Sequence, residues 1–435
     1  MDRVSRHLEH IDPSHFILVV IAMIAAAILV PKKHGMELSI IVAAAWLNMN
    51  RFSNLGPVAS VAKGTFWLPL LAVIWFAYVR PGHRNPIPSV AWAYLITPII
   101  GCICVATTLD RVLGFVQFGS MFLLALSALL VYRTVDTEKS LIRVIASIFL
   151  GLMVPLGISI IALMFFRAQS FIPGLGRFAP FGMNPNQLVP ILATILGLAG
   201  CGMIGFKSKA WRIVCMAAIG SCATLLVATA SRQGIIVGAI AMLPVGFWAA
   251  KRPLVAGIMA VVIVGVGVWL FGYTEGALST DRLAEVTTSG RYENAFVYAN
   301  MIAKRPVAGL LGTKGQSILI GAEADKIPHN SYMGVLYTGG LMMGVPLIYA
   351  LLKTLTSMYY VLSNRDRINL PPAVLWTAAS IMIAIYLHGA ANDMIYWSVS
   401  TWTFLHFFLS CLFVGLANQL RENRYSFASP QLRYA

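Results

Sequence analysis

Acidic residues are scarce in this chain of 435 residues, where 16 Asp and Glu stand against 32 Lys and Arg. Charge of either sign is uncommon, because charged residues make up 11% of the chain, against roughly 25% in a soluble domain. Hydrophobic residues make up 58% instead. This composition excludes a soluble protein and predicts a single integral membrane domain over residues 1–435.

The chain also lacks clustered metal ligands and the common nucleotide-binding motifs. All six cysteines lie within apolar segments, where we expect them to be small core residues. No His-Glu-x-x-His, Gly-x-Ser-x-Gly or Walker motif occurs, and no Asp-x-Asp pair occurs either. We therefore expect no metal and no cofactor, and neither ATP nor a metal-bound nucleotide sugar as a substrate.

Long apolar runs follow one another along most of the chain. A transmembrane helix needs about 20 apolar residues, within a range of about 17–25. Thirteen runs are candidates, although two of them, 36–49 and 66–79, have only 14 residues each. We therefore expect an all-α polytopic membrane protein with about 12 (12–13) transmembrane helices. Twelve spans, the favoured number, put both ends inside, whereas thirteen would put the N-terminus outside. The candidates are 15–30, 36–49, 66–79, 89–108, 112–131, 141–166, 187–206, 211–229, 233–250, 253–271, 331–352, 372–391 and 398–417.

Basic residues in alternate connections predict the orientation, because Lys- and Arg-rich connections stay in the cytoplasm. The connections between them are poorer in charge or balanced, as in 272–330, which has six acidic and six basic residues. That long polar stretch is expected to be an extracytoplasmic loop that forms part of an active site. The net charge of +16 fits this asymmetry and an attraction to anionic membrane lipids, and we expect no nucleic-acid partner. The basic connections hold Arg80 and Arg84, Arg133, Lys139 and Arg143, Lys207, Lys209 and Arg212, Lys251 and Arg252, Arg365 and Arg367, and Arg421 and Arg424.

Ionisable side chains are almost absent from the apolar runs. Proton-coupled transporters usually need such groups near the midplane of the membrane, and many transporters carry internal repeats, which this sequence lacks. An enzyme is therefore favoured over a pump or a lipid-linked glycan flippase. The unusual polar residues collect instead at the ends of runs that share the expected periplasmic face.

One such cluster begins a predicted helix within the polar loop. Apolar residues recur at helical spacing after Arg291, and Pro306 marks the end of the helix. A cation at a helix N-terminus opposes the helix dipole, so Arg291 is best explained if an anion binds there. Lys304, Arg305 and Lys314 add positive charge that would help to hold phosphate. The alternative is a solvated surface Arg paired with Glu293.

Two further clusters lie at the ends of apolar runs. Arg177, Asn184 and Asn186 precede the run at 187, where Asn186 is a candidate helix cap and a purely structural turn is an equal alternative. Ser231 and Arg232 form a turn between two runs. An Arg beside a span is often only an interfacial anchor. Because positive residues are disfavoured on this face, a functional role for Arg232 is favoured.

The last cluster closes the polar loop with Pro328, His329, Asn330, Ser331 and Tyr332. Asn330 or Ser331 can cap the helix that follows. The positive end of that helix should keep the imidazole of His329 neutral and able to accept a proton. The nearby segment His388 to Asp393 lies on the same face, and there a structural role is favoured.

The ordered set Asn184-Pro185-Asn186, Ser231-Arg232, Arg291 and His329-Asn330 resembles the O-antigen ligase and polymerase superfamily of bacterial inner-membrane glycosyltransferases. The resemblance spans most of the chain by hydropathy and is sharpest between Arg177 and Tyr332. It implies a C-type glycosyltransferase-like fold, in which a periplasmic helical loop covers a cavity. It also implies a metal-independent, inverting transfer of a glycan from undecaprenyl pyrophosphate.

The resemblance suggests roles for individual residues. Arg232 and Arg291 would stabilise the leaving diphosphate, and His329 would accept the proton of the acceptor hydroxyl, with Glu293 or Asp393 as alternative bases. Substrate binding would fall to Asn330, Tyr332, Arg177, Asn184, Asn186, Lys304 and Arg305. We expect an O-antigen ligase of the bacterial inner membrane, whose acceptor is lipid A–core. A repeat-unit polymerase with the same chemistry is the alternative.

Overall fold

The computed structural model describes residues 32–80, 82, 84–173, 175–205, 208–250, 291–314, 316–318, 328–392 and 399–422. The expected spans 15–30 and 253–271 therefore lie outside the described residues, as does the first third of the predicted polar loop, 272–290. The backbone of Arg291 is described, but its side chain is not.

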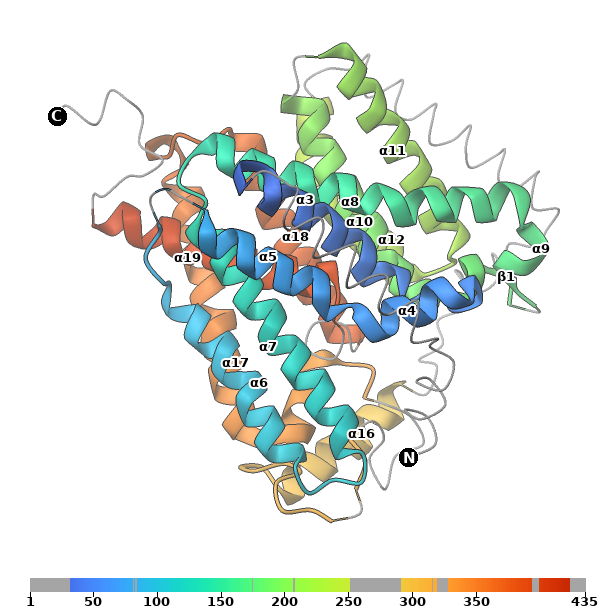
Figure 1. The fold of residues 1–435 in the computed structure, drawn as a ribbon, viewed down its shortest axis with the longest axis vertical. Helices are drawn as coiled ribbons and strands as arrows, with labels where there is room; N and C mark the ends of the chain where they lie inside the picture. The colour runs from blue at the N-terminus through green and yellow to red at the C-terminus, as the bar shows by residue number, and fades with distance from the viewer. Residues whose placement is uncertain are drawn as a thin grey trace.

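Helices form almost all of the described chain (Figure 1), and one short antiparallel hairpin interrupts them. The helices longer than one turn are α3 (Lys32–Met49), α4 (Pro57–Thr65), α5 (Trp67–Val79), α6 (Ser89–Val105), α7 (Arg111–Arg133), α8 (Glu138–Phe165), α10 (Pro185–Gly205), α11 (Lys209–Ala228), α12 (Arg232–Ala241), α13 (Leu243–Ala250), α16 (Arg291–Lys304), α17 (Ser331–Ser363), α18 (Pro372–Ala391) and α19 (Thr401–Arg421). The short elements are η1 (Ser53–Leu55), α9 (Arg167–Ser170), β1 (Phe171–Ile172), β2 (Arg177–Phe178), η2 (Pro180–Gly182) and η3 (Arg365–Arg367).

Seven of the described helices are long and apolar enough to cross a membrane, namely α7, α8, α10, α11, α17, α18 and α19. The pair α12 and α13 counts as an eighth if it is one bent span. The chain is thus an all-helical, multi-pass membrane protein. The shorter helices α5 and α6, with 13 and 17 residues, coincide with expected runs but are below the length for a straight span.

The predicted run 233–250 is not one straight helix. It is divided into α12 and α13, which meet at an angle of 56°. Pro244 is the second residue of α13. Proline has no N–H to donate to the carbonyl of residue 240, and its ring collides with that carbonyl, which favours a kink or a break at this point.

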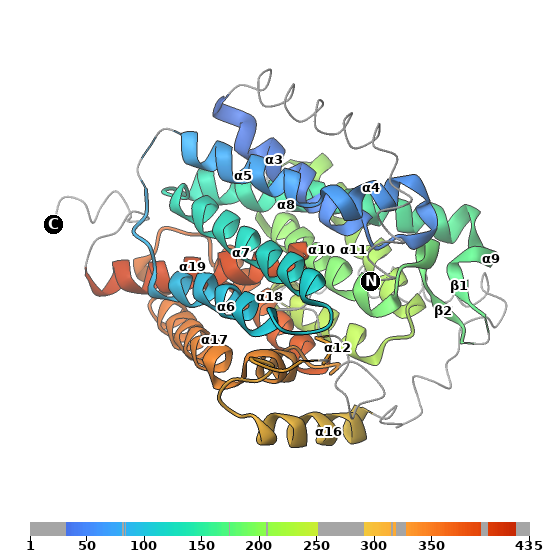
Figure 2. The same ribbon diagram turned by 60° about the horizontal axis from the view of Figure 1, so that its bottom comes forward.

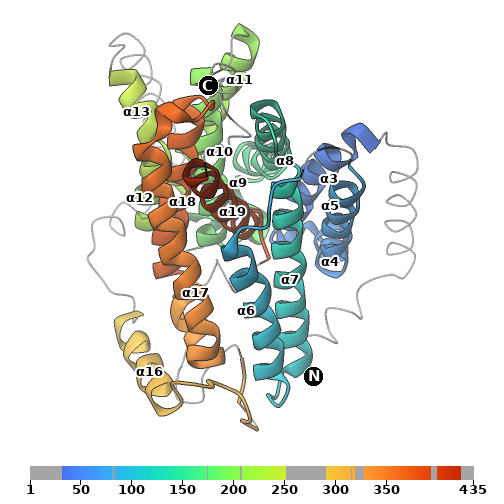
Figure 3. The same cartoon turned by 90° about the vertical axis from the view of Figure 1, so that its left-hand side faces the viewer.

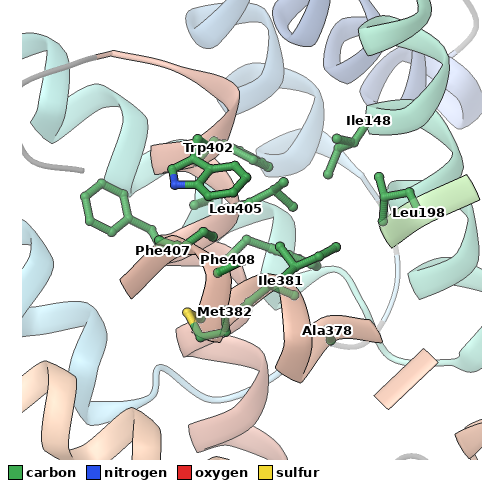
Figure 4. Close-up of a cluster of buried hydrophobic side chains, with 14 of the residues drawn as sticks. Ile148, Leu198, Ala378, Ile381, Met382, Trp402, Leu405, Phe407 and Phe408 are labelled. Carbon is green, nitrogen blue, oxygen red and sulfur yellow. The ribbon is translucent and has the colours of Figure 1, made fainter. Parts of the chain in front are cut away.

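Helix α19 runs through the centre of the bundle, where Figure 3 shows it nearly end-on between its neighbours. Nearly all of its side chains are buried. Its Trp402, Leu405 and Phe408 pack with Ile381 of α18 and Leu198 of α10 in the core cluster drawn in Figure 4. Helices α3, α4 and α5 form one flank of this core, beside α7 and α8 (Figures 1 and 3).

Helix α17 is longer than the expected run 331–352, and it is broken at Gly340, where φ is +54° and ψ is −144°. The break leaves the carbonyl of Thr338 and the amide of Leu341 without partners in their own helix. The loop after α16 supplies those partners: the Leu310 amide donates to the Thr338 carbonyl at 2.8 Å, and Leu341 donates to the Pro306 carbonyl at 2.8 Å. Helix α16 is therefore held against the outside of α17 (Figure 2).

The end of the same loop is hydrogen-bonded to the turn between α6 and α7. Asp110 accepts hydrogen bonds from the hydroxyl of Ser317 at 2.7 Å and from the amide of Ile318 at 2.9 Å. The Leu109 amide donates to the Gln316 carbonyl at 3.0 Å. These contacts place the α6–α7 turn, α16 and the start of α17 at one end of the bundle.

Basic connections meet at the opposite end. The buried Asn85 accepts from the Gln419 side chain at 3.3 Å, and its carbonyl accepts from the Arg133 guanidinium at 3.2 Å. The guanidinium of Arg421 lies over the ring of Tyr360, 5.0 Å from its centroid. Asn85, Gln419 and Arg421 thus lie at one end of the bundle, and the predicted clusters at Arg177 and Arg232 lie at the other.

Candidate functional site

Arg177 lies on β2, where the hairpin pairs it with Ile172. Its Nε donates to the carbonyl of Thr229 at 3.0 Å, and a terminal nitrogen donates to Oδ1 of Asn186 at 3.0 Å. The half-buried guanidinium therefore joins the start of α10 to the end of α11. Two directed bonds hold this cation in one orientation.

The start of α10 differs from the sequence expectation in one detail. Asn186 was the expected cap, but Asn184 provides the capping contact, since its Oδ1 accepts the amide of Asn186 at 2.9 Å. The reason is that Asn186 already lies inside the helix, which begins at Pro185. A proline at the first helical position leaves the cap to the residue before it. The Asn186 side chain is thereby left to bind Arg177.

Arg232 is the first residue of α12, and it is half-buried. Ser231 caps this helix by accepting the amide of Gly234 at 3.2 Å. The residue before the cap, Ala230, is buried and has φ of +46°, a conformation that costs a residue with a Cβ about 1–2 kcal/mol. Strain of this kind persists where the surrounding structure imposes it, and it often occurs at functional turns.

Gln233 connects this turn to the end of α18. Its Nε2 donates to the carbonyl of His388 at 3.0 Å, and its Oε1 accepts from the side chain of Asn392. His388 is buried, with its ring edge-on to Trp402 at 5.9 Å. The structural role expected for this segment agrees with these contacts.

The start of α17 meets the end of α18 at the same place. Asn330 is the helix cap, and its Oδ1 accepts the amides of Tyr332 at 3.0 Å and Met333 at 3.1 Å. Its Nδ2 donates to the carbonyl of Ala390 at 2.7 Å. The hydroxyl of Ser331 donates to the carbonyl of Asn392 at 2.7 Å.

Tyr332 and His329 flank that cap. The Tyr332 hydroxyl donates to the carbonyl of Tyr386 at 3.1 Å, which fixes a second point on α18. His329 is half-buried and precedes the cap by one residue. The hydrogen bonds of Asn330 fix the backbone beside it.

Asn392 joins these clusters into one junction. Its side chain contacts Gln233, the neighbour of Arg232, and its carbonyl binds Ser331, two residues after His329. Arg232 and His329 are far apart in sequence, yet they lie one and two residues, respectively, from residues bonded directly to Asn392. Arg177 extends the junction to Asn186 through the end of α11.

Arg51 is a further residue near the junction, and it was not among the residues predicted from the sequence. It follows α3, is half-buried, and lines a cavity of about 10 Å³ together with Asn48, Gln187, Ser400 and Trp402. Gln187 is the neighbour of Asn186, and Trp402 packs against His388. The sequence feature that could have identified Arg51 is its place as a lone Arg in a short polar connection between two apolar runs.

Three predicted site residues belong to α16 or its end. Arg291 is the first described residue of α16, and its side chain is outside the described residues. Lys304 and Arg305 are exposed at the far end. That end is bonded to the middle of α17, so the described contacts do not bring Lys304 and Arg305 to the junction of Arg232 and His329.

The alternative bases are placed differently. Glu293 is exposed on the first turn of α16, and Asp393 lies outside the described residues. Within the ranges that the structure describes, no three His, Cys, Asp or Glu side chains are grouped as metal ligands. The junction instead offers guanidinium groups, an imidazole and amide side chains, which suit an anionic ligand that must also exchange a proton.

Comparison with known proteins adds no family to this description. No protein-family model matches the chain, and no curated protein matches it by sequence.

Proposed function

We propose that this protein is an O-antigen ligase-type glycosyltransferase of the bacterial inner membrane. It would transfer a glycan from undecaprenyl pyrophosphate to a hydroxyl of lipid A–core at the periplasmic face. The observation that supports the proposal is the junction at Asn392, whose partners Gln233 and Ser331 lie one residue from Arg232 and two residues from His329 at one end of a membrane-spanning bundle. A cation and a base near this junction would fit a diphosphate leaving group and a hydroxyl nucleophile.

The transfer is a single displacement. The acceptor oxygen forms a bond to the anomeric carbon while the bond from that carbon to the diphosphate oxygen breaks, so the configuration inverts. Undecaprenyl pyrophosphate leaves with the bonding electrons, and Arg232 and Arg291 neutralise its added charge. Such contacts are strongest in a site that excludes bulk water, because the local dielectric is low.

His329 takes the proton from the attacking hydroxyl. Asn330 would help to position it, because the side chain of this adjacent residue is bonded to Ala390 of α18 and caps α17. Arg177 and Asn186 hold each other and the end of α11, so their role is to position the turn that carries Arg232. Lys304 and Arg305 are left as peripheral contacts for the glycan or its phosphates.

Two substitutions of Arg232 test this proposal directly. Arg232→Lys keeps the charge but loses the two-pronged hydrogen bonding of a guanidinium, so it should restore only part of the activity that Arg232→Ala loses. Both variants should be recovered as folded protein. Near-normal transfer by Arg232→Ala would remove this residue from the site.

Deletion of the gene separates the ligase from the polymerase. A ligase deletion should abolish every lipopolysaccharide band that carries O-antigen, while glycan accumulates on undecaprenyl pyrophosphate. A polymerase deletion leaves a product with a single repeat. If neither change appears on gels and the lipid-linked glycan pool is normal, the proposed function is wrong.

A further inference from the structure

A cavity of about 320 Å³ opens between α8, α10 and α11, at the end of the bundle opposite the Asn392 junction. The first residues of α18 close it on one side. Its lining is apolar apart from Glu138, and includes Ile142, Phe149, Cys201 and Trp211. The candidate site uses none of these residues.

The mouth of this cavity faces the expected membrane interior. Ile142, Leu150 and Trp211 line it and are also exposed, by 37%, 40% and 45%. They belong to α8 and α11, two of the helices long and apolar enough to cross a bilayer. An opening on such a surface is filled by hydrocarbon, and Trp211 near a helix start is typical of the membrane interface.

Basic side chains surround the same end. Lys139 and Arg143 of α8 are exposed, and so are Lys209 and Arg212 of α11. Arg143 and Arg212 each follow a lining residue by one position. The acidic groups on these elements are Glu138, which lines the cavity, and Asp136, whose Oδ1 accepts from Ser140 at 3.3 Å. The balance is positive, and each basic residue near a membrane surface attracts anionic lipid by about 1 kcal/mol.

We propose that the cavity binds one acyl chain of an anionic phospholipid, whose phosphate lies among the basic residues at the start of α8 and α11. The tail of the polyprenyl donor is a less suitable occupant. Asn186 lies in the first turn of α10 and the cavity lies near the end of the same helix, whose 21 residues rise about 30 Å in all. A donor whose diphosphate binds at the Asn392 junction therefore has its headgroup at the wrong end of the bundle. A phospholipid of the other leaflet has its headgroup at the basic end, beside the cavity.

The chain offers a variant that fills the cavity without a clash. Gly205 lines it, and a Cβ built on Gly205 meets nothing within 4 Å. Gly205→Phe therefore occupies the space of the acyl chain. Gly157→Phe is the matched control, because Gly157 also has nothing within 4 Å and is not a lining residue. The double variant Lys209→Ala/Arg212→Ala removes two charges from the rim.

Native mass spectrometry of the full-length protein, titrated with phosphatidylglycerol or phosphatidylcholine, tests the proposal. The wild type and Gly157→Phe should retain one phosphatidylglycerol, and Gly205→Phe should retain it at least about tenfold more weakly. The double variant should lose about tenfold or more of the affinity for phosphatidylglycerol and little for phosphatidylcholine.

Three results would overturn the proposal. Gly205→Phe could retain phosphatidylglycerol as well as the wild type does, in which case the cavity is not the site. The wild type could hold both lipids equally, in which case the basic rim selects nothing. A polyprenyl diphosphate could displace phosphatidylglycerol and itself be lost from Gly205→Phe, in which case the cavity belongs to the donor.

Discussion

Gln233 is the side chain through which the start of α12 meets the end of α18, and we expect it to set the position of Arg232. Removing it by Gln233→Ala deprives the buried Asn392 amide of its bond, at a cost of about 1–3 kcal/mol in stability. A displacement of the turn by about 1 Å can lower a rate by about 10²-fold. Transfer by Gln233→Ala should therefore fall by about that factor.

Gln419 provides the control for this experiment. It is also half-buried, and it bonds the buried Asn85 at the opposite end of the bundle. Gln419→Ala should lower the thermal unfolding midpoint to a similar degree while transfer stays near the wild-type rate. Equal losses of transfer in both variants would show that Gln233 acts only through stability.

Individual residues of the site were predictable when their role follows from local chain geometry. A cap at Asn330 or Ser331 was expected before an apolar run, and the structure shows that Asn330 is the cap. The role of Asn392 was not predictable, because its partners Gln233 and Ser331 come from two distant helix starts. Arg51 was missed for the same reason, since only the fold brings it beside Gln187.

At the scale of elements, the break in α17 is the feature that holds the loop after α16. Gly340 has a backbone conformation that is open almost only to glycine, and a Cβ there would lie 2.6 Å from the carbonyl oxygen of Pro306. Gly340→Ala should therefore cost about 1–3 kcal/mol and release the loop. Hydrogen exchange of the amides between Arg305 and Thr313 should rise.

Gly119 of α7 is the matched control for this substitution. A Cβ on Gly119 meets nothing within 4 Å, so Gly119→Ala should be neutral or stabilise its helix by up to about 1 kcal/mol. The account of the break fails if exchange in the loop is the same in Gly340→Ala and Gly119→Ala.

The elements themselves were largely predictable from hydropathy, and their interruptions only in part. Every expected run between residues 36 and 250 and between 331 and 417 contains a helix of the described chain. The division of 233–250 could have been inferred from Pro244 only as one possibility, because Pro98, Pro155 and Pro190 lie inside undivided helices. The break at Gly340 could not, because two adjacent glycines do not reveal that a distant loop supplies the missing hydrogen bonds.

For the whole molecule, the account requires the two ends of the bundle to face opposite sides of the membrane. A cysteine at Lys304 should react with a membrane-impermeant maleimide in spheroplasts, because the Asn392 junction and α16 share the expected periplasmic end. A cysteine at Lys209, at the start of α11, should react only after permeabilisation. The wild type gives the background from its six free cysteines, four of which are buried. The reverse pattern of labelling would reject the mechanism.

The chemistry at that end should not depend on a metal. Arg232 and Arg291 are assigned the charge stabilisation that a divalent ion would otherwise provide. Transfer by the purified protein should therefore be unchanged after treatment with EDTA. Complete loss of transfer with EDTA, restored by a divalent cation, would contradict this assignment.

The most direct measurement of the central claim is transfer by the full-length protein in liposomes that contain glycan-linked undecaprenyl pyrophosphate and lipid A–core. The account predicts that the wild type releases undecaprenyl pyrophosphate and forms glycan-linked lipid A–core in equal amounts. His329→Ala should bind the donor nearly as well and turn over about 10²–10⁴-fold more slowly. A wild type that forms no product, or a His329→Ala variant with full turnover, would contradict the account.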